Sequence, residues 1–307
     1  MRALVTGATG FVGSHLVRLL RERDVHVAIV RRPASDLWRL GELSADVEHL
    51  VGDLRAVATL LPGIEAFAPD VVFHLGWGGV ANVHRNDPAQ FENPACALDL
   101  LGGAARAGVR TWIGLGSQAE YGSIEGRIGE DHPTRPTTLY GIAKLATGLA
   151  TLAHGTTLGL RVAWLRLFST YGPMDGPGWL IPSVARELLA GRTPPLTLGT
   201  QRWDYLYVRD VAEALYAAAS APQVAGCYNL GSGEARTVRS IVEAVRARIP
   251  DAPPLAFGAV PFRADQVMHL EADTTRLRRD TGWAPIVAFD DGVSQTVQWI
   301  REHGIVD

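Results

Sequence analysis

The eight residues TGATGFVG, at positions 6–13, separate a short apolar run from an amphipathic stretch. The run RALVTG (2–7) predicts a buried strand, and SHLVRLLRER (14–23) places its apolar residues on one helical face. Between them, a glycine at every third position allows the backbone to approach a pyrophosphate at the N-terminus of the helix. This context favours the strand–loop–helix unit of a dinucleotide-binding fold over an ordinary glycine-rich turn.

The rest of the first half continues the alternation of strand and helix. Helical patterns at 89–107 and about 138–154 lie between near-continuous apolar runs, which predict buried strands at 25–30, 47–53, 70–76, 109–117 and 160–168. Apolar strands that alternate with helices are typical of a parallel sheet covered on both faces. We therefore predict an α/β fold with a Rossmann-type doubly wound parallel sheet.

The second half has a different organisation. The Gly/Pro-rich stretch YGPMDGPGW (171–179) ends the regular alternation of strands and helices. We predict a dinucleotide-binding Rossmann domain over 1–170, to which about 204–232 returns. Residues 171–203 and 233–307 are predicted to form a smaller C-terminal α/β substrate domain that caps the sheet.

Composition excludes several classes of protein. The net charge is −3 over 307 residues, so no excess of positive charge indicates nucleic acid or an anionic membrane as a partner. Cys96 and Cys227 are the only cysteines, and no HExxH spacing occurs, so we expect neither a disulfide framework nor a metal site. The sequence has neither a signal-peptide pattern at its N-terminus nor an apolar window of about 18 residues. We expect a cytoplasmic protein.

Two arginines decide the predicted cofactor. An acid at the end of the second strand would bind the ribose 2′-hydroxyl of NAD, but Arg31 and Arg32 stand there, with no acid until Asp36. Guanidinium groups suit a 2′-phosphate, so we predict NADPH over NADH; the alternative is a pair of solvated arginines in a surface loop. Farther on, Asp53 ends a strand and either reaches the adenine or caps the strand end.

The segment LYGIAK (139–144) places Tyr140 and Lys144 four residues apart on one helical face. An ammonium about 4 Å from the phenol contributes about 4 kcal/mol at an effective dielectric of about 20. This lowers the tyrosine pKa by roughly three units, toward 7. A surface helix can carry the same spacing by chance, but Ser117 ends a predicted strand at the sheet edge where ligands bind. We therefore predict that Ser117 holds a carbonyl oxygen that Tyr140 protonates.

At this point the chain resembles the extended short-chain dehydrogenase/reductase family, in its nucleotide-sugar-modifying, NAD-dependent epimerase/dehydratase-like branch. The resemblance rests on segments that follow in order over about 300 residues: TGATGFVG, DVVFHLG, GSQAEYG, EDHPTRPTTLYGIAK, LRLFSTYGP, WDYLYVRDVAEA, YNLGSG and DTTRLRRDTGWAP. It implies catalytic roles for Ser117, Tyr140 and Lys144, and a C-terminal domain that binds a nucleotide sugar.

The resemblance also implies two sets of binding residues. We expect the cofactor to contact Gly7, Thr9, Gly10, Phe11, Val12, Gly13, Arg31, Arg32, Asp53, Leu54, Leu75, Gly76, Trp77, Tyr140 and Lys144. We expect the substrate to contact Trp77, Val80, Ser117, Gln118, Tyr140, Ser169, Arg202 and Arg263. Ser169 stands where the family usually has Asn, and Trp203 separates Arg202 from the Asp that an arginine usually precedes. Trp77 replaces a small residue and either shapes the sugar pocket or fills core.

Departures from the family pattern narrow the reaction. Dehydratases have an Asp–Glu pair directly after the catalytic Ser or Thr, whereas this chain has Gln118 and Ala119 there. Glu120 follows on a segment expected to be extended and therefore points elsewhere. Epimerase/reductases that invert C3 and C5 need a Cys/His pair, and Cys96 lies on a predicted helix, not beside Ser117. Epimerases acting through a 4-keto intermediate retain NAD, while Arg31 and Arg32 favour NADPH consumed stoichiometrically.

We therefore predict an NADPH-dependent reductase for the 4-keto group of a nucleotide-activated 4-keto-6-deoxy sugar. An NAD(P)-dependent nucleotide-sugar 4-epimerase is the alternative. A non-catalytic redox-sensing binder on the same fold is disfavoured, because such proteins can dispense with the Tyr–Lys pair that this chain retains. By analogy with the family, we expect a homodimer formed through the helices near 89–107 and 138–154.

Overall fold

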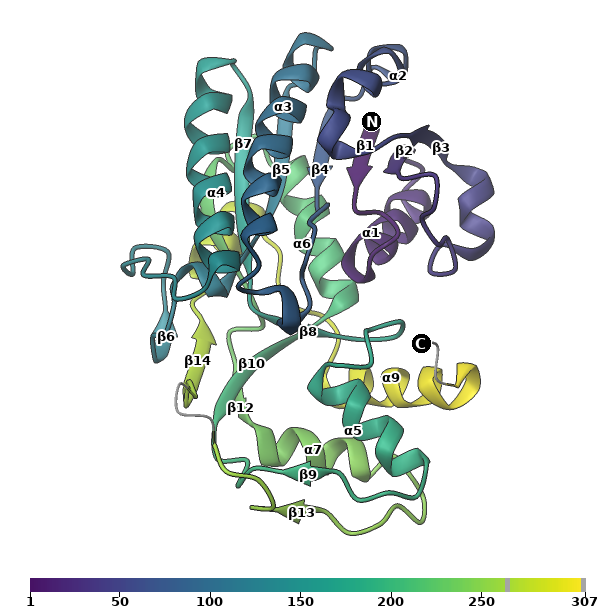
Figure 1. The fold of residues 1–307 in the computed structure, drawn as a ribbon, viewed down its shortest axis with the longest axis vertical. Coiled ribbons are helices and arrows are strands. Elements are labelled where there is room, and N and C mark those ends of the chain that lie inside the picture. Colours follow the sequence, from purple (N-terminus) through teal and green to yellow (C-terminus); the bar gives the residue numbers. More distant parts are fainter. Residues whose placement is uncertain (263–265, 305–307) are drawn as a thin grey trace.

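The computed structural model describes residues 1–262 and 266–304. In these residues, seven parallel strands form a large sheet in the order β11-β7-β5-β4-β1-β2-β3 (Figure 1). The strands are β1 (Arg2–Thr6), β2 (His26–Arg31), β3 (Glu48–Val51), β4 (Val71–His74), β5 (Thr111–Ser117), β7 (Arg161–Leu167) and β11 (Gly226–Leu230). All four residues of β4 are buried, as expected for a strand covered on both faces. The predicted doubly wound parallel sheet is confirmed.

Helices cover both faces of this sheet, and they pack through two separate cores. One core joins α1 (Phe11–Glu22) and α6 (Val208–Ser220) to one face of the sheet. The other joins α2 (Leu61–Phe67) and α3 (Glu92–Arg106) to the opposite face, where α4 (Leu139–Thr157) packs beside α3 (Figure 1). Alternate residues of the inner strands contribute to the two cores: Leu4 of β1 belongs to one, and Ala3 and Val5 to the other.

A second group of elements lies beyond the carboxyl ends of the large sheet (Figure 1). Its strands are β6 (Gly126–Ile128), β8 (Ser169–Tyr171), β10 (Arg202–Tyr207), β12 (Ala235–Thr237) and β14 (His269–Ala272), with β10 at the centre. β9 (Pro195–Leu196) pairs with β13 (Ala256–Phe257). Helices α5 (Leu180–Leu189), α7 (Val238–Arg246) and α9 (Phe289–His303) share one apolar core, while α8 (Thr275–Thr281) packs against β11.

Sheet pairing shows where the chain passes between the two groups. The stretch 204–232, which the sequence predicts to return to the large sheet, does so only from α6 onward. β10 pairs with β12, β14 and β8, whereas β11 adds an edge strand next to β7. β6 belongs to the first half of the sequence, but it pairs with β14 in the second group.

Short 3-10 helices connect several of these elements: η1 (Gly41–Asp46), η2 (Leu54–Thr59), η3 (Asn82–His84), η4 (Pro88–Phe91) and η5 (Gln118–Glu120). Within the described ranges, none of the helices combines the length and apolar character needed to cross a bilayer.

Candidate active site

A cavity of about 1410 Å³ opens at the carboxyl ends of the parallel strands. Its walls include the loops after β1, β2, β3 and β4, the end of β5, the start of α4 and the segment from β8 to α5. In doubly wound sheets this edge is where ligands bind, because the loops on either side of the switch in strand order separate there. The cavity is large enough for a dinucleotide and a second ligand together.

The glycine loop forms one wall of the cavity as predicted from the sequence. Gly7 adopts φ +71°, and a Cβ there would lie 2.7 Å from the Leu75 carbonyl carbon. A Cβ on Gly13 would lie 2.1 Å from the Gly7 carbonyl oxygen, so α1 can approach β1 only because both residues lack side chains. Gly10 caps α1 without a side chain, which leaves backbone N–H groups at the helix N-terminus for an anion. The other loop residues expected to bind cofactor, Thr9, Phe11 and Val12, also line the cavity.

The end of β2 presents positive charge to the same cavity. Arg31 and Arg32 line it, together with Ser35 and Arg39, which the sequence analysis missed. Nε of Arg31 donates to Nδ1 of His49 at 2.7 Å, which assigns the His49 proton to Nε2, 2.8 Å from the Ser44 carbonyl oxygen. This contact holds Arg31 at the strand end.

Asp53 lies at the cavity and also caps the 3-10 helix that follows β3. It lines the cavity with Leu54, and its carboxylate also caps η2 by accepting from the Arg55 N–H at 2.9 Å. Side-chain hydrogen bonds from Arg55 lower the pKa of Asp53 to about 2. The carboxylate is therefore charged at neutral pH.

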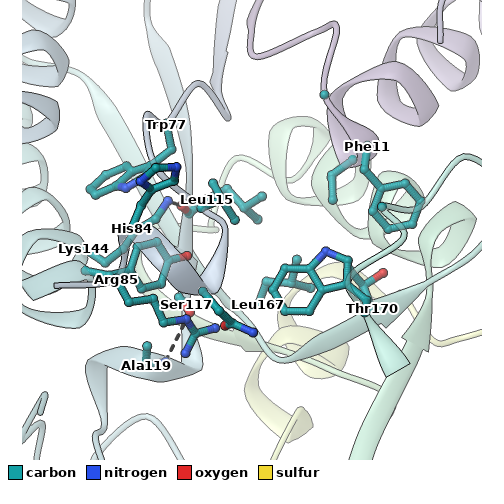
Figure 2. Close-up of a pocket in the computed structure, with 18 of the residues that line it drawn as sticks. Phe11, Trp77, His84, Arg85, Leu115, Ser117, Ala119, Lys144, Leu167 and Thr170 are labelled. Atoms are coloured by element: carbon teal, nitrogen blue, oxygen red, sulfur yellow. Dashed lines mark hydrogen bonds between the residues drawn. The ribbon is translucent and has the colours of Figure 1, made fainter. Parts of the chain in front are cut away.

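Ser117, Tyr140 and Lys144 all line the cavity, although Ser117 comes from β5 and the other two from α4. Figure 2 shows Ser117 and Lys144 on the same side of it. The Thr138 side chain caps α4 by accepting from the Gly141 N–H at 3.1 Å, which fixes the start of the helix. Tyr140 is 7% exposed and Lys144 5% exposed, and both line the cavity.

The electrostatics of the pair differ from the sequence-based expectation. Burial raises the pKa of Tyr140, opposed by a hydrogen bond with Ser117 and by the charge of Arg85. Burial lowers the pKa of Lys144 to about 7. The expectation that Lys144 lowers the Tyr140 pKa toward 7 is therefore wrong for this structure. The reason is that burial disfavours the Lys144 ammonium itself, whose Nζ donates to the Leu115 carbonyl oxygen at 2.7 Å.

Trp77 lies directly over Lys144. The ammonium is 3.8 Å from the Trp77 ring centroid, which is cation–π geometry, and the indole meets the Tyr140 ring edge-on at 6.0 Å. Nε1 of Trp77 donates to Oε1 of Gln90 at 2.9 Å, so the indole is held in place from behind. Trp77 lines the cavity with Leu75 and Gly76 instead of filling core.

The segment after Ser117 does not carry a carboxylate into the cavity. Gln118 and Ala119 line it, while Glu120 is fully buried. Glu120 accepts hydrogen bonds from the Ser117 N–H at 2.9 Å, from Trp164 Nε1 at 3.0 Å and from Arg166 Nε at 2.8 Å. Glu120 thus points away from the cavity as predicted, but from the 3-10 helix η5 and not from an extended segment.

The expected substrate residues are only partly brought together. Val80 and Ser169 line the cavity with Trp77, Gln118, Ser117 and Tyr140. Arg202 does not: its neighbours Gln201 and Trp203 face the cavity, while Arg202 donates to the Ala235 carbonyl oxygen at 2.8 Å. Alternation along β10 sends its side chain to the other face. Arg263 lies outside the described residues.

Further cavity residues were not predicted from the sequence, among them Arg85, Asp175, Trp179 and Tyr205. They come from loops and from β10, where local patterns do not show which side chains turn inward. Cys96, on α3, lines the cavity but is not part of the Ser117 wall.

A doubly wound sheet with a glycine loop, and a Ser, Tyr and Lys at the same cavity, defines the class of dinucleotide-binding α/β enzymes. The sequence pattern of the NAD dependent epimerase/dehydratase family matches residues 3–231. The chain therefore belongs to this family, and the resemblance found in the sequence is confirmed at that level.

Individual relatives match over nearly the whole chain. A dTDP-glucose 4,6-dehydratase of Streptomyces griseus is 30% identical, with 98% of this chain and 94% of that protein covered. A UDP-glucose 4-epimerase of Azospirillum brasilense is also 30% identical, over 98% of this chain and 92% of its own length. The crystal structure of a UDP-glucose 4-epimerase of Thermus thermophilus in complex with NAD superposes with a TM-score of 0.87 at 29% identity, covering 99% of this chain and 100% of the other.

Proposed function

We propose that this protein uses NADPH to reduce the 4-keto group of a nucleotide-activated 4-keto-6-deoxy sugar. The main support for this reaction is the set of residues around Ser117. Ser117 and Tyr140 face the cavity, while the two following positions hold Gln118 and Ala119, and the nearby Glu120 is bound by Arg166. This wall can polarise a carbonyl and donate a proton, but it offers no carboxylate beside Ser117 for the elimination that a dehydratase performs.

Each of the three residues has a defined role. The Ser117 hydroxyl donates to the substrate carbonyl oxygen and makes the carbonyl carbon more electrophilic. The Tyr140 hydroxyl donates its proton to the same oxygen. Lys144 supplies N–H groups for the ribose next to the nicotinamide, from a position fixed by Leu115 and Trp77. When bound, NADPH supplies the hydride that completes the reduction.

The residues around the cavity fit this cofactor. Backbone N–H groups of residues 11–13, in the first turn of α1, would bind the pyrophosphate, and Leu75, Gly76 and Trp77 line the cavity toward Tyr140. At the opposite end, Arg31, Arg32 and Ser35 provide the donors that a 2′-phosphate needs. The adenine is assigned to the region of Asp53 and Leu54.

Support for a nucleotide sugar comes from the relatives, whose names specify dTDP-glucose and UDP-glucose. In this chain, Val80, Gln118 and Ser169 would contact the sugar, and Arg263 the diphosphate. Arg202 would need to turn from Ala235 to take part.

The direct test is a panel of enzymatically prepared NDP-4-keto-6-deoxyhexoses incubated with NADPH or NADH. We expect NADPH absorbance to fall with a member of this panel, and kcat/KM to be higher with NADPH than with NADH. A clear preference for NADH would contradict the cofactor assignment. Failure to oxidise either cofactor with every ketosugar would contradict the reductase.

A second function, NAD(P)-dependent 4-epimerisation of a nucleotide sugar, is favoured by the UDP-glucose 4-epimerase relatives. The two functions differ in stoichiometry. An epimerase interconverts two 4-hydroxy sugars without net loss of cofactor, whereas the reductase consumes one NADPH for each ketosugar.

We also propose that two copies of the chain associate through α3 and α4. Leu149 and Ile142 of α4 are 59% and 38% exposed. A shallow hollow between the two helices is lined by Leu98, Asp99, Ala150, Ala153, His154 and Thr157. Exposed aliphatic residues on one helical face favour a protein partner over solvent.

A further inference from the structure

We infer that Arg85 is a positioning residue for the proton donor, holding a positive charge beside Tyr140 that stabilises the phenolate left when the phenol gives up its proton. The inference rests on the proposed role of Tyr140 as that donor. Arg85 stands in the loop after β4, where the sequence predicted roles for Leu75, Gly76, Trp77 and Val80 but not for Arg85, and its side chain lines the cavity (Figure 2).

The backbone fixes Arg85 against the helix that carries Tyr140. The Tyr140 N–H donates to the Arg85 carbonyl oxygen at 2.9 Å, and the Leu139 N–H donates to Oδ1 of Asn86 at 3.2 Å. Arg85 and Asn86 therefore satisfy two N–H groups in the first turn of α4, which would otherwise lack helical partners. A short loop tied to the helix in this way brings the Arg85 side chain next to the phenol as a consequence of the fold.

The guanidinium itself is close to the ring. Its central carbon lies 5.5 Å from the centroid of the Tyr140 ring. Nε of Arg85 is buried and has no hydrogen-bond partner among the described residues. Among the residues that the structure describes, no carboxylate forms an ion pair with Arg85, so no paired anion offsets its charge at the cavity wall.

The other charged groups around Tyr140 are bound to partners of their own. Lys144 of α4 donates to the Leu115 carbonyl oxygen and lies under Trp77. Glu120 of η5 is paired with Arg166 at 2.8 Å. His84, beside Arg85 in the loop, lines the same cavity.

Arg85 and Lys144 also differ in the pH range over which they carry a positive charge. A guanidinium stays protonated throughout the range in which proteins remain folded. Burial lowers the pKa of Lys144 to about 7, so its positive charge fades above neutrality. The charge of Arg85 lowers the Tyr140 pKa against the effect of burial, in the direction that eases proton donation.

The proton transfer balances as follows. As hydride adds to the carbonyl carbon, the Tyr140 O–H bond breaks and the proton goes to the carbonyl oxygen, which becomes the product hydroxyl. The electron pair of that bond stays on the phenol oxygen as a phenolate beside Arg85. A proton from solvent restores Tyr140 after the product leaves.

The test measures the acidity of residue 140 without a substrate. 3,5-Difluorotyrosine, which is more acidic than tyrosine, is placed at position 140 of the full chain, and its pKa is followed by ¹⁹F NMR. We expect Arg85→Gln to raise this pKa by about one unit, the low end of the effect of one charge at this range. Arg85→Lys should restore most of the shift. Arg135→Gln, at an exposed arginine five residues before Tyr140, should leave the pKa unchanged.

A pKa in Arg85→Gln equal to that of the parent would overturn the inference, as would an equal rise in Arg135→Gln. A loss of local structure would raise the pKa in Arg85→Lys as much as in Arg85→Gln, and this too would count against it. The NMR titration uses no ketosugar, so the two proposals can fail separately. If Arg85→Gln raises the pKa but no ketosugar of the panel is reduced, the proposed reaction is rejected and the Arg85–Tyr140 coupling is established.

Discussion

At the scale of single residues, the pair that first suggested chemistry is buried in the wall of a cavity, but its two members act in different ways. Tyr140 stands beside Ser117, and Lys144 is held by Leu115 and Trp77. Sequence spacing predicted that Tyr140 and Lys144 share a helical face. It could not show the direction of the ammonium, because that depends on Trp77 and Leu115, which come from other elements.

Tyr140→Phe removes only the proton donor from the proposed mechanism. We expect turnover of the ketosugar to fall by roughly 100-fold or more, since positioned acid catalysis contributes on that order. Cofactor affinity, measured by fluorescence titration, should change by no more than severalfold because the ring remains in place. Turnover equal to that of the parent protein would remove Tyr140 from the mechanism.

Lys144 also makes a prediction about stability. The folded chain disfavours its ammonium, since burial lowers its pKa from 10.5 to about 7. Below pH 7 this cost is present in full, and it disappears as pH rises toward 10.5, where the unfolded chain also loses the proton. Lys144→Met should therefore raise the free energy of unfolding at about pH 6, with a smaller gain at about pH 9.

Urea unfolding of Lys144→Met and the parent protein at the two pH values measures this difference directly. If Lys144→Met gains the same free energy of unfolding at both pH values, the cost of the buried ammonium does not explain the difference in stability between the variant and the parent.

At the scale of elements, the close approach of α1 to β1 depends on Gly13, which the sequence analysis singled out from the spacing of the glycines. Gly13→Ala places a Cβ 2.1 Å from the Gly7 carbonyl oxygen, so the loop and helix must move apart. We expect dinucleotide affinity to fall at least tenfold, because the backbone N–H groups of residues 11–13 shift from the proposed pyrophosphate site, and we expect Tm to fall as well.

Gly102→Ala is the matched control, because it makes the same substitution inside α3. A Cβ there meets its nearest neighbour, Nη1 of Arg106, at 3.7 Å. This variant should keep its dinucleotide affinity and gain about 0.5–1 kcal/mol of stability from the better helix propensity of alanine. Equal dinucleotide affinity in Gly13→Ala and Gly102→Ala would contradict the close-approach explanation.

Elements with a strong periodic pattern were the ones predicted well from sequence. The strand predicted at 109–117 is β5 (Thr111–Ser117), and the helix predicted at about 138–154 is α4 (Leu139–Thr157). The short segment after Ser117 was predicted incorrectly, because η5 is set by a capping interaction between Ser117 and Glu120. Arg166 and Trp164, which hold Glu120, are more than 40 residues away, and no local pattern includes them.

At the scale of the whole molecule, alternation of strands and helices was enough to predict the large sheet, because right-handed crossovers leave few possible topologies. The second group of strands could not be predicted in the same way. β6 pairs with β14 across Leu270–Gly126, and β10 lies between β12 and β14. These strands are short and their partners distant in sequence, so tertiary packing decides which residues, such as Trp203 but not Arg202, face the cavity.

The proposed homodimer is the prediction that belongs to this scale. Ile142, Leu149 and Ala153 recur at helical spacing on α4 and are exposed, so the stripe has no partner within one copy of the chain among its described residues. Two α3–α4 pairs packed face to face would bury this stripe in both copies, as a two-fold interface requires. A charged side chain at the centre of this stripe should destabilise the assembly only if the stripe is buried in an interface.

Leu149→Glu should therefore convert a dimer into a monomer in size-exclusion chromatography with light scattering. Ile286→Glu makes the same change at a residue that is 76% exposed in the loop before α9, and it should leave the mass unchanged. Because the cavity residues of one copy come from a single chain, both variants should bind dinucleotide with the parent affinity. A monomeric parent protein, or a Leu149→Glu variant with the parent mass, would show that α3 and α4 do not form the interface.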